Sequence, residues 1–141
     1  MRIGKEITAV FPVPNDPDGA EVTIIHLNPG QVEDIQERMK AYKTVMRRHG
    51  NTLEPEIEQN SDLGDKRYMF VVESIKDWKN FKDAKGKDLP CDSRTKIAVS
   101  RATEVTVTRD GDRKEVVAFP SWISECRSAL AEQLLLERTA G

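Results

Sequence analysis

Apolar and polar residues alternate near the N-terminal end of the chain, a pattern typical of strands with one buried face. Residues 3–13 alternate loosely, and residues 20–27 resume the apolar pattern after a stretch rich in proline, asparagine and aspartate. Within that stretch, residues 15–19 (Asn-Asp-Pro-Asp-Gly) form a strong turn signal. We therefore predict an N-terminal hairpin over residues 3–27, and the prolines that end its first strand favour an edge position.

The period then changes to that of a helix. Asn28 is a candidate N-cap, Pro29 occupies the first helical position, and Gln31 stands at the capping-box position. Apolar side chains follow at spacings of three and four: Val32, Ile35, Met39, Tyr42 and Met46. Gly50 is a typical helix stop. The pattern predicts a helix over residues 29–48, followed by a loop over residues 51–66.

The tryptophan-containing segment over residues 67–91 fits two patterns. Residues 68–72 are rich in β-branched and aromatic residues, which suits a buried strand. Apolar residues also fall on one helical face: Tyr68, Val71, Val72, Ile75, Trp78 and Phe81. We favour a helix over residues 67–82, followed by a loop over residues 83–92 that contains Gly86, Leu89 and Pro90. A short helix is expected to begin with Asp92 or Ser93 as its cap.

The C-terminal third predicts a second hairpin and a final helix. Residues 103–107 alternate and are rich in β-branched side chains, residues 109–112 (Arg-Asp-Gly-Asp) are a turn signal, and residues 114–119 return as a strand. A helix over residues 120–137 follows this hairpin over residues 103–119. Its expected core face consists of Trp122, Ile123, Cys126, Ala129, Leu130, Gln133 and Leu134.

These elements predict an α+β fold in one small domain spanning residues 1–141. A chain of 141 residues with 38% hydrophobic residues can bury a single core. The formal net charge of -2 lacks the basic excess of a dedicated nucleic-acid binder. No apolar run approaches the ~20 residues of a membrane span, and two cysteines are too few for a disulfide scaffold. We therefore expect a cytoplasmic protein without membrane contact.

Candidate chemistry is sparse. The only histidines, His26 and His49, show no metal-ligand spacing with Cys91 or Cys126. No serine nucleophile motif is present, and Cys91 is interpreted as a partly buried free thiol. We expect no catalytic residue, no metal and no cofactor.

A lysine cluster surrounds Trp78 and Phe81 and gives an alternative function. It consists of Lys76, Lys79, Lys82, Lys85 and Lys87. On a helix, residues 76, 79 and 82 would align and could follow a phosphate backbone, as in a small nucleic-acid-binding regulator. Aspartates interrupt the cluster, so a solvated face is the preferred interpretation.

The segment Ser74–Cys91 (SIKDWKNFKDAKGKDLPC) resembles one found in small proteins of tailed-phage and prophage tail modules. The shared features are an apolar residue and a tryptophan, a short gap, an aspartate, a glycine turn and a Leu-Pro exit. The N-terminal order is similar too: a hairpin with an Asp-Pro-x-Gly turn and then a Leu-Asn-Pro-Gly helix start at residues 27–30. The hairpin over residues 103–119 is longer than the usual connection in that family.

The resemblance implies a tail assembly chaperone or a small tail accessory protein. Its partners would be the tape-measure protein or the tail tube protein, bound in the cytoplasm of the bacterial host. A structural component retained in the virion is the alternative within the same family. By this resemblance Ile75, Trp78, Phe81, Gly86, Leu89 and Pro90 are motif residues.

Two apolar groups are candidates for the binding surface. Trp78 and Phe81 either anchor a loop against the core, which we favour, or present Trp78 as a hot spot for a partner. Leu134, Leu135 and Leu136 cover too much of a helix circumference for one buried stripe. At least one of these leucines should be exposed and could dock on a partner or on a second copy of the chain.

Overall fold

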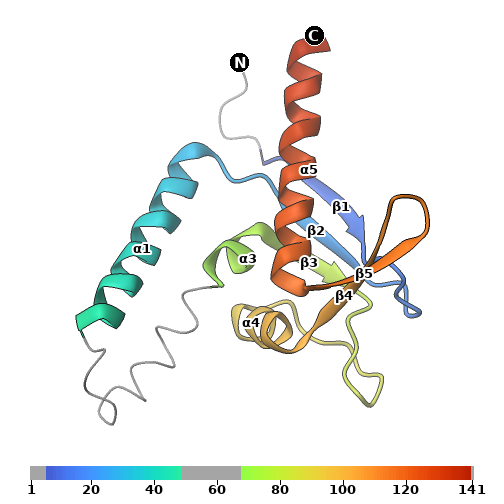
Figure 1. Cartoon of the computed structure of the whole chain (residues 1–141). Helices are drawn as coiled ribbons and strands as arrows, with labels where there is room; N and C mark the ends of the chain where they lie inside the picture. Colours follow the sequence, from blue (N-terminus) through green and yellow to red (C-terminus); the bar gives the residue numbers. More distant parts are fainter. Residues whose placement is uncertain (1–5, 49–67, 141) are drawn as a thin grey trace.

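Among the residues that the computed structural model describes, two antiparallel sheets and four helices build an α+β domain (Figure 1). The structure describes residues 6–48 and 68–140, with the side chains of residues 6–40 and 68–137. The three-stranded sheet has the order β1 (Thr8–Pro12), β2 (Glu21–Ile25), β3 (Ile75–Lys79), and the other sheet pairs β4 (Glu104–Arg109) with β5 (Arg113–Ala118). The helices are α1 (Pro29–Arg48), α3 (Met69–Ser74), α4 (Ser93–Ala102) and α5 (Phe119–Ala140). Residues 3–5, the helix stop at Gly50, the loop predicted over 51–66 and the side chains of Tyr42 and Met46 lie outside the described residues.

The start of α1 confirms the predicted capping box. The backbone N–H of Gln31 donates to the Asn28 side-chain oxygen, and the backbone N–H of Asn28 donates to the Gln31 side-chain oxygen, each at 2.9 Å. These reciprocal bonds satisfy two backbone donors and define where the helix begins. Ile35 of the predicted stripe is buried, whereas Val32 and Met39 are half-buried.

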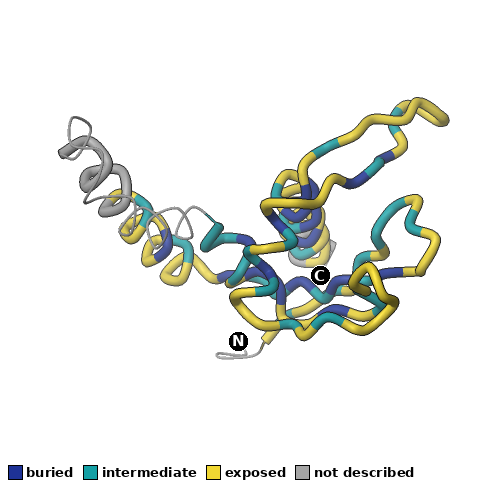
Figure 2. Tube along the Cα trace, turned by 90° about the horizontal axis from the view of Figure 1, so that it is seen from below, coloured by how far each residue is buried: buried dark blue, intermediate teal, exposed yellow. Residues whose placement is uncertain are grey.

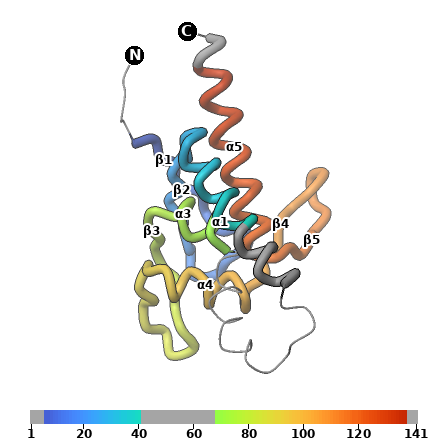
Figure 3. Tube along the Cα trace, turned by 90° about the vertical axis from the view of Figure 1, so that its left-hand side faces the viewer, coloured from blue at the N-terminus to red at the C-terminus, as the bar shows by residue number. Residues whose placement is uncertain are grey.

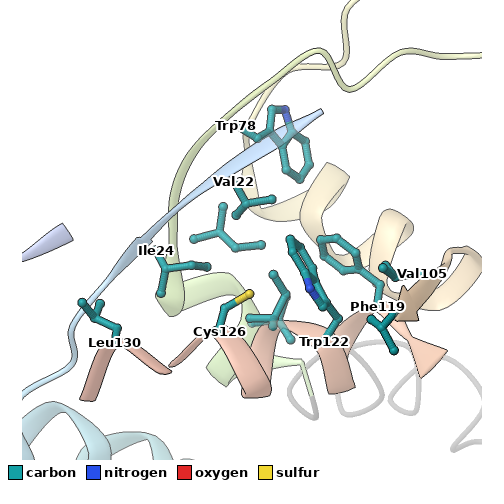
Figure 4. Packing of buried hydrophobic residues seen from close by; sticks show 12 residues of the cluster. Val22, Ile24, Trp78, Val105, Phe119, Trp122, Cys126 and Leu130 are labelled. Carbon is teal, nitrogen blue, oxygen red and sulfur yellow. The ribbon is translucent and has the colours of Figure 1, made fainter. Parts of the chain in front are cut away.

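The core lies between α5 and the inner faces of both sheets (Figure 4). Val22 and Ile24 of β2, Ile75 and Trp78 of β3, and Val105 and Val107 of β4 meet the buried residues of α5 there. The α5 residues are Phe119, Trp122, Ile123, Cys126 and Leu130. Alternation along β2 and β4 points their side chains inward, as the sequence pattern predicted.

The helix favoured over residues 67–82 is wrong for its second half. A helix ends at Ser74, and residues 75–79 form β3 against β2. The register pairs Val22 with Trp78 and Thr23 with Asp77, but Ile24 with Ile75, so Lys76 is an extra residue in β3. This β-bulge turns both Ile75 and Trp78 toward the core although they are three residues apart. The spacing that resembled a helical face is therefore that of a bulged strand. The alternative of a strand over residues 68–72 is also wrong, because residues 69–74 form α3.

Helix α4 begins as predicted. The Asp92 side chain caps it by accepting a hydrogen bond from the Thr95 N–H at 2.8 Å. The pKa of Asp92 is lowered by its hydrogen bonds to Thr95. Lys96, in the first turns of α4, is buried, and its ammonium donates to the Ile75 carbonyl at 2.7 Å and the Val72 carbonyl at 3.2 Å. A charged donor thus ties α4 to the end of α3 and the start of β3.

Both predicted hairpins form. Asn15 and Gly19 in the first turn, and Asp110 and Gly111 in the second, have positive φ, which these residue types adopt at least cost. Strand β1 lies at the edge of its sheet, and Pro12 ends it. Figure 2 shows that the β4–β5 hairpin projects from the body of the domain with mostly exposed residues near its turn. Within the described residues, no helix has an apolar stretch long enough to cross a membrane.

Candidate protein-binding site

Two of the three predicted leucines lie on the surface. Leu135 is 62% exposed and Leu136 is 64% exposed, whereas Leu134 is half-buried and packs against the core. Consecutive helical residues point ~100° apart, so Leu135 and Leu136 point ~100° and ~200° away from the half-buried Leu134 and face solvent. The predicted exposure of at least one leucine is confirmed. We call the face formed by Leu135 and Leu136 the leucine surface.

The buried face of α5 is narrower than the sequence predicted. Trp122, Ile123, Cys126 and Leu130 are buried, but Ala129 and Gln133 are exposed. Core contacts thin out along the helix because its C-terminal part extends beyond the sheets, as Figure 1 and Figure 3 show from two sides. The leucine surface therefore lies on a projecting rod rather than in a recess.

Trp78 belongs to the core and not to the protein surface. It is 8% exposed, and its ring stacks on Phe81 with 4.4 Å between centroids and 4° between planes. Phe81 in turn meets Phe119 edge to face at 6.1 Å, and Phe119 meets Trp122 at 6.0 Å. This aromatic row connects β3 to α5, as expected for an anchor and not for an exposed hot spot.

The loop after β3 is held by the same tryptophan. The Trp78 indole N–H donates to the Leu89 carbonyl at 3.0 Å, and the Leu89 N–H donates to the Phe81 carbonyl at 2.7 Å. Between them Asp83 accepts from the N–H groups of Lys85 and Lys87, and Gly86 has a φ of 83°. Pro90 is exposed just after this turn. The motif residues thus form a small loop that Trp78 and Phe81 anchor to the core. Ile75, the remaining motif residue, is buried in β3.

The lysine cluster does not form the helical row that would follow a phosphate backbone. Lys76 and Lys79 lie on β3 and Lys82 lies in the following loop, because this segment is a strand. Lys76 forms an ion pair with Glu6, and Lys82 forms one with Asp88. These ion pairs offset the charges of Lys76 and Lys82, which weakens the case for a nucleic-acid-binding regulator.

A cleft of about 210 Å³ opens between the β1–β2 turn, the loop after β3 and β4. Apolar residues form much of its wall, among them Phe119, the first residue of α5. The carboxylates of Asp16, Asp18 and Glu104 also line it. Asp16 accepts a hydrogen bond from the Ala20 N–H at 2.8 Å, as a turn aspartate does. Neither a histidine nor a cysteine lines the cleft, so its lining contains no nucleophile paired with a histidine base. Across the described part of the chain, no three metal-ligating side chains of the His, Cys, Asp and Glu type gather.

Both thiols are shifted away from reactivity. Burial raises the pKa of Cys91, although Lys96 partly opposes the shift, and burial raises the pKa of Cys126 to about 12. A reactive cysteine requires the opposite shift, because the thiolate is the nucleophile. The structure therefore gives neither cysteine the setting of a catalytic nucleophile.

We expect iodoacetamide at pH 8.5 to alkylate Cys91 in the folded chain and to leave Cys126 intact. An unfolded thiol titrates near ~8.5, so Cys126 becomes a thiolate on unfolding but stays neutral when folded. A raised folded pKa also means that the stability contributed by this neutral thiol is present below pH ~8.5 and is lost as the pH rises toward 12. Mass spectrometry of peptides from native and urea-treated protein measures both sites. Equal labelling of the two cysteines in the native chain would contradict the buried placement of Cys126.

Comparison with protein-family models, curated proteins and solved structures gives no match for this chain. Two features of the structure were not predicted from the sequence: the burial of Lys96 and the 59% exposure of Val116 on β5. Neither has a local signal, because both depend on which segments pack together.

Proposed function

We propose that this protein is a non-enzymatic protein-binding factor in bacteriophage or prophage tail assembly, acting in the cytoplasm of the bacterial host as a chaperone or adaptor. The observation that carries the proposal is the leucine surface on the projecting end of α5. Exposed neighbouring leucines on a helix are a typical docking surface for an apolar groove or helix of a partner. The resemblance of residues 74–91 to small tail proteins supplies the kind of partner, a tape-measure or tail tube protein.

The leucine surface makes a specific prediction about binding. Leu136→Asp should weaken capture of a co-expressed tape-measure or tail tube protein about thirty-fold, the loss expected when a hot-spot residue worth ~2 kcal/mol is removed. Capture by the wild-type chain should persist at high salt, because apolar contacts respond little to ionic strength. A pull-down from co-expressed tail proteins at low and high salt measures both effects.

Ser124→Asp is the matched control. Ser124 is exposed on the same helix, about 18 Å along the axis from residue 136, and the change introduces the same charge. The proposal fails if both variants capture the tail protein equally well, or if only nucleic acid is captured and is released at high salt. Presence of the chain in purified virions would instead favour a structural tail component.

A further inference from the structure

The outer edge of β5 offers a row of backbone hydrogen-bonding groups. The Phe119 N–H donates to the Thr103 carbonyl at 3.0 Å, one position beyond the last printed pair of the β4–β5 ladder, Glu104 with Ala118, so Thr103 and Phe119 continue the register as a hydrogen-bonded pair. Opposed residues in an antiparallel ladder alternate between bonded and non-bonded pairs. By this alternation the backbone N–H and C=O groups of three residues point away from β4: Lys114, Val116 and Ala118.

An independent contact supports this assignment of hydrogen-bonded and non-bonded pairs. On β4 the same alternation directs the Thr106 carbonyl away from β5, and the Asn15 side-chain amide donates to that carbonyl at 2.7 Å. The β1–β2 turn therefore covers part of the outer edge of β4. No described strand pairs with the outer edge of β5, and the turn end of the hairpin projects away from the helices in Figure 1 and Figure 2.

This edge lacks proline, one of the devices that usually block strand addition. Strand β1 ends in Pro12, whereas residues 113–118 contain no proline. Its three charged side chains are held within the chain: Arg113 by Asp110, Lys114 by Asn15 and Thr108, and Glu115 by Arg109. Val116, at the middle of the open edge, is 59% exposed on the outer face.

Charge selects one register for pairing of this edge with a second copy of itself. Centring a twofold axis on Glu115 would oppose two carboxylates, and centring it on Lys114 would oppose two ammonium groups. Centring it on Val116 places Val116 against Val116, Lys114 against Ala118, and Glu115 against Val117. Moving the axis further shortens the overlap, because β5 ends at Ala118.

We propose that β5 pairs antiparallel with β5 of a second copy about a twofold axis at Val116, so that the two hairpins form one continuous sheet. Outward-facing groups of Lys114, Val116 and Ala118 then bond their counterparts, and the two exposed valines pack side by side on the outer face. Such an isologous contact closes on itself and gives a dimer, not a fibre. This pairing involves neither the leucine surface nor the segment that resembles tail proteins.

Val116→Pro tests the pairing with little damage to the hairpin. Its missing N–H is one that β4 does not use, so the fold should persist by circular dichroism and tryptophan fluorescence. Sedimentation over a concentration series should show a wild-type dimer and a monomeric Val116→Pro. Val116→Thr, which keeps the N–H and the β-branched shape, should remain dimeric. If the proline variant unfolds, Val116→Lys places like charges at the axis and should also be monomeric.

A cysteine at residue 116 tests the register. Bonded pairs place opposed Cα atoms ~5.5 Å apart, within disulfide range. In a Cys91→Ala background, Val116→Cys should form a disulfide dimer under diamide, whereas Glu115→Cys, which faces Val117, should not. A wild-type monomer at all concentrations, a dimer that Val116→Pro and Val116→Lys leave intact, or equal cross-linking at both positions would overturn the proposal. Loss of the dimer in Leu136→Asp alone would place self-association on α5 and also overturn it.

Discussion

Trp78→Ala should lower the free energy of unfolding by about 3–5 kcal/mol, the cost of truncating a buried aromatic residue. The ring is 8% exposed and stacks on Phe81, so its removal leaves a cavity between β3 and the start of α5. The indole N–H also leaves the Leu89 carbonyl without its donor. Chemical denaturation followed by circular dichroism measures the loss.

Two variants separate the contributions to this loss. Trp78→Phe keeps an aromatic ring in the stack and removes the hydrogen bond, so it should cost less than the alanine variant. Lys79→Ala, at the exposed next position of β3, should stay within about 0.5 kcal/mol of wild type. A wild-type midpoint for Trp78→Ala would place the tryptophan on the surface and return it to the binding candidates.

Lys96→Ala should cost about 2–4 kcal/mol. Its ammonium is buried and donates to two carbonyls where α3 gives way to β3, and hydrogen bonds to charged groups are worth roughly 1.5–3 kcal/mol each. A cation at the C-terminal end of a helix is also favoured by the helix dipole. The desolvation of the ammonium offsets part of this gain, which keeps the expected loss below the sum. Denaturant unfolding of the two proteins gives the difference.

Lys96→Met isolates the hydrogen bonds from the packing of the side-chain stem. Methionine fills similar space but donates to neither carbonyl, so Lys96→Met should restore only part of the stability that Lys96→Ala loses. A Lys96→Met protein as stable as wild type would show that the two hydrogen bonds contribute no net stability. Lys96→Ala removes both the side-chain stem and the ammonium, whereas Lys96→Met removes only the ammonium. The difference in unfolding free energy between the two variants therefore gives the contribution of the stem.

Sequence by itself determined the elements whose ends are fixed by neighbouring residues. Asn28 and Gln31 satisfy each other's backbone groups, and Asp92 caps the Thr95 N–H, so both helix starts were predictable. Positive φ at Gly19 and Gly111 likewise follows from local turn chemistry. The exposure of Leu135 or Leu136 required only the rotation per residue of a helix.

Only the tertiary structure decided the features that depend on distant partners. Residues 75–79 became a strand because β2 offers an edge to pair with, and the bulge at Lys76 gave Ile75 and Trp78 a spacing that a lone sequence presents as helical. Lys96 is buried because the ends of α3 and β3 bring two carbonyls to it. The β1–β2 turn reaches the outer edge of β4, whereas no described strand pairs with the outer edge of β5. Caps and turns are set within a few residues, whereas strand partners and burial are set by segments far apart in the chain, and a pattern along one segment carries no record of them.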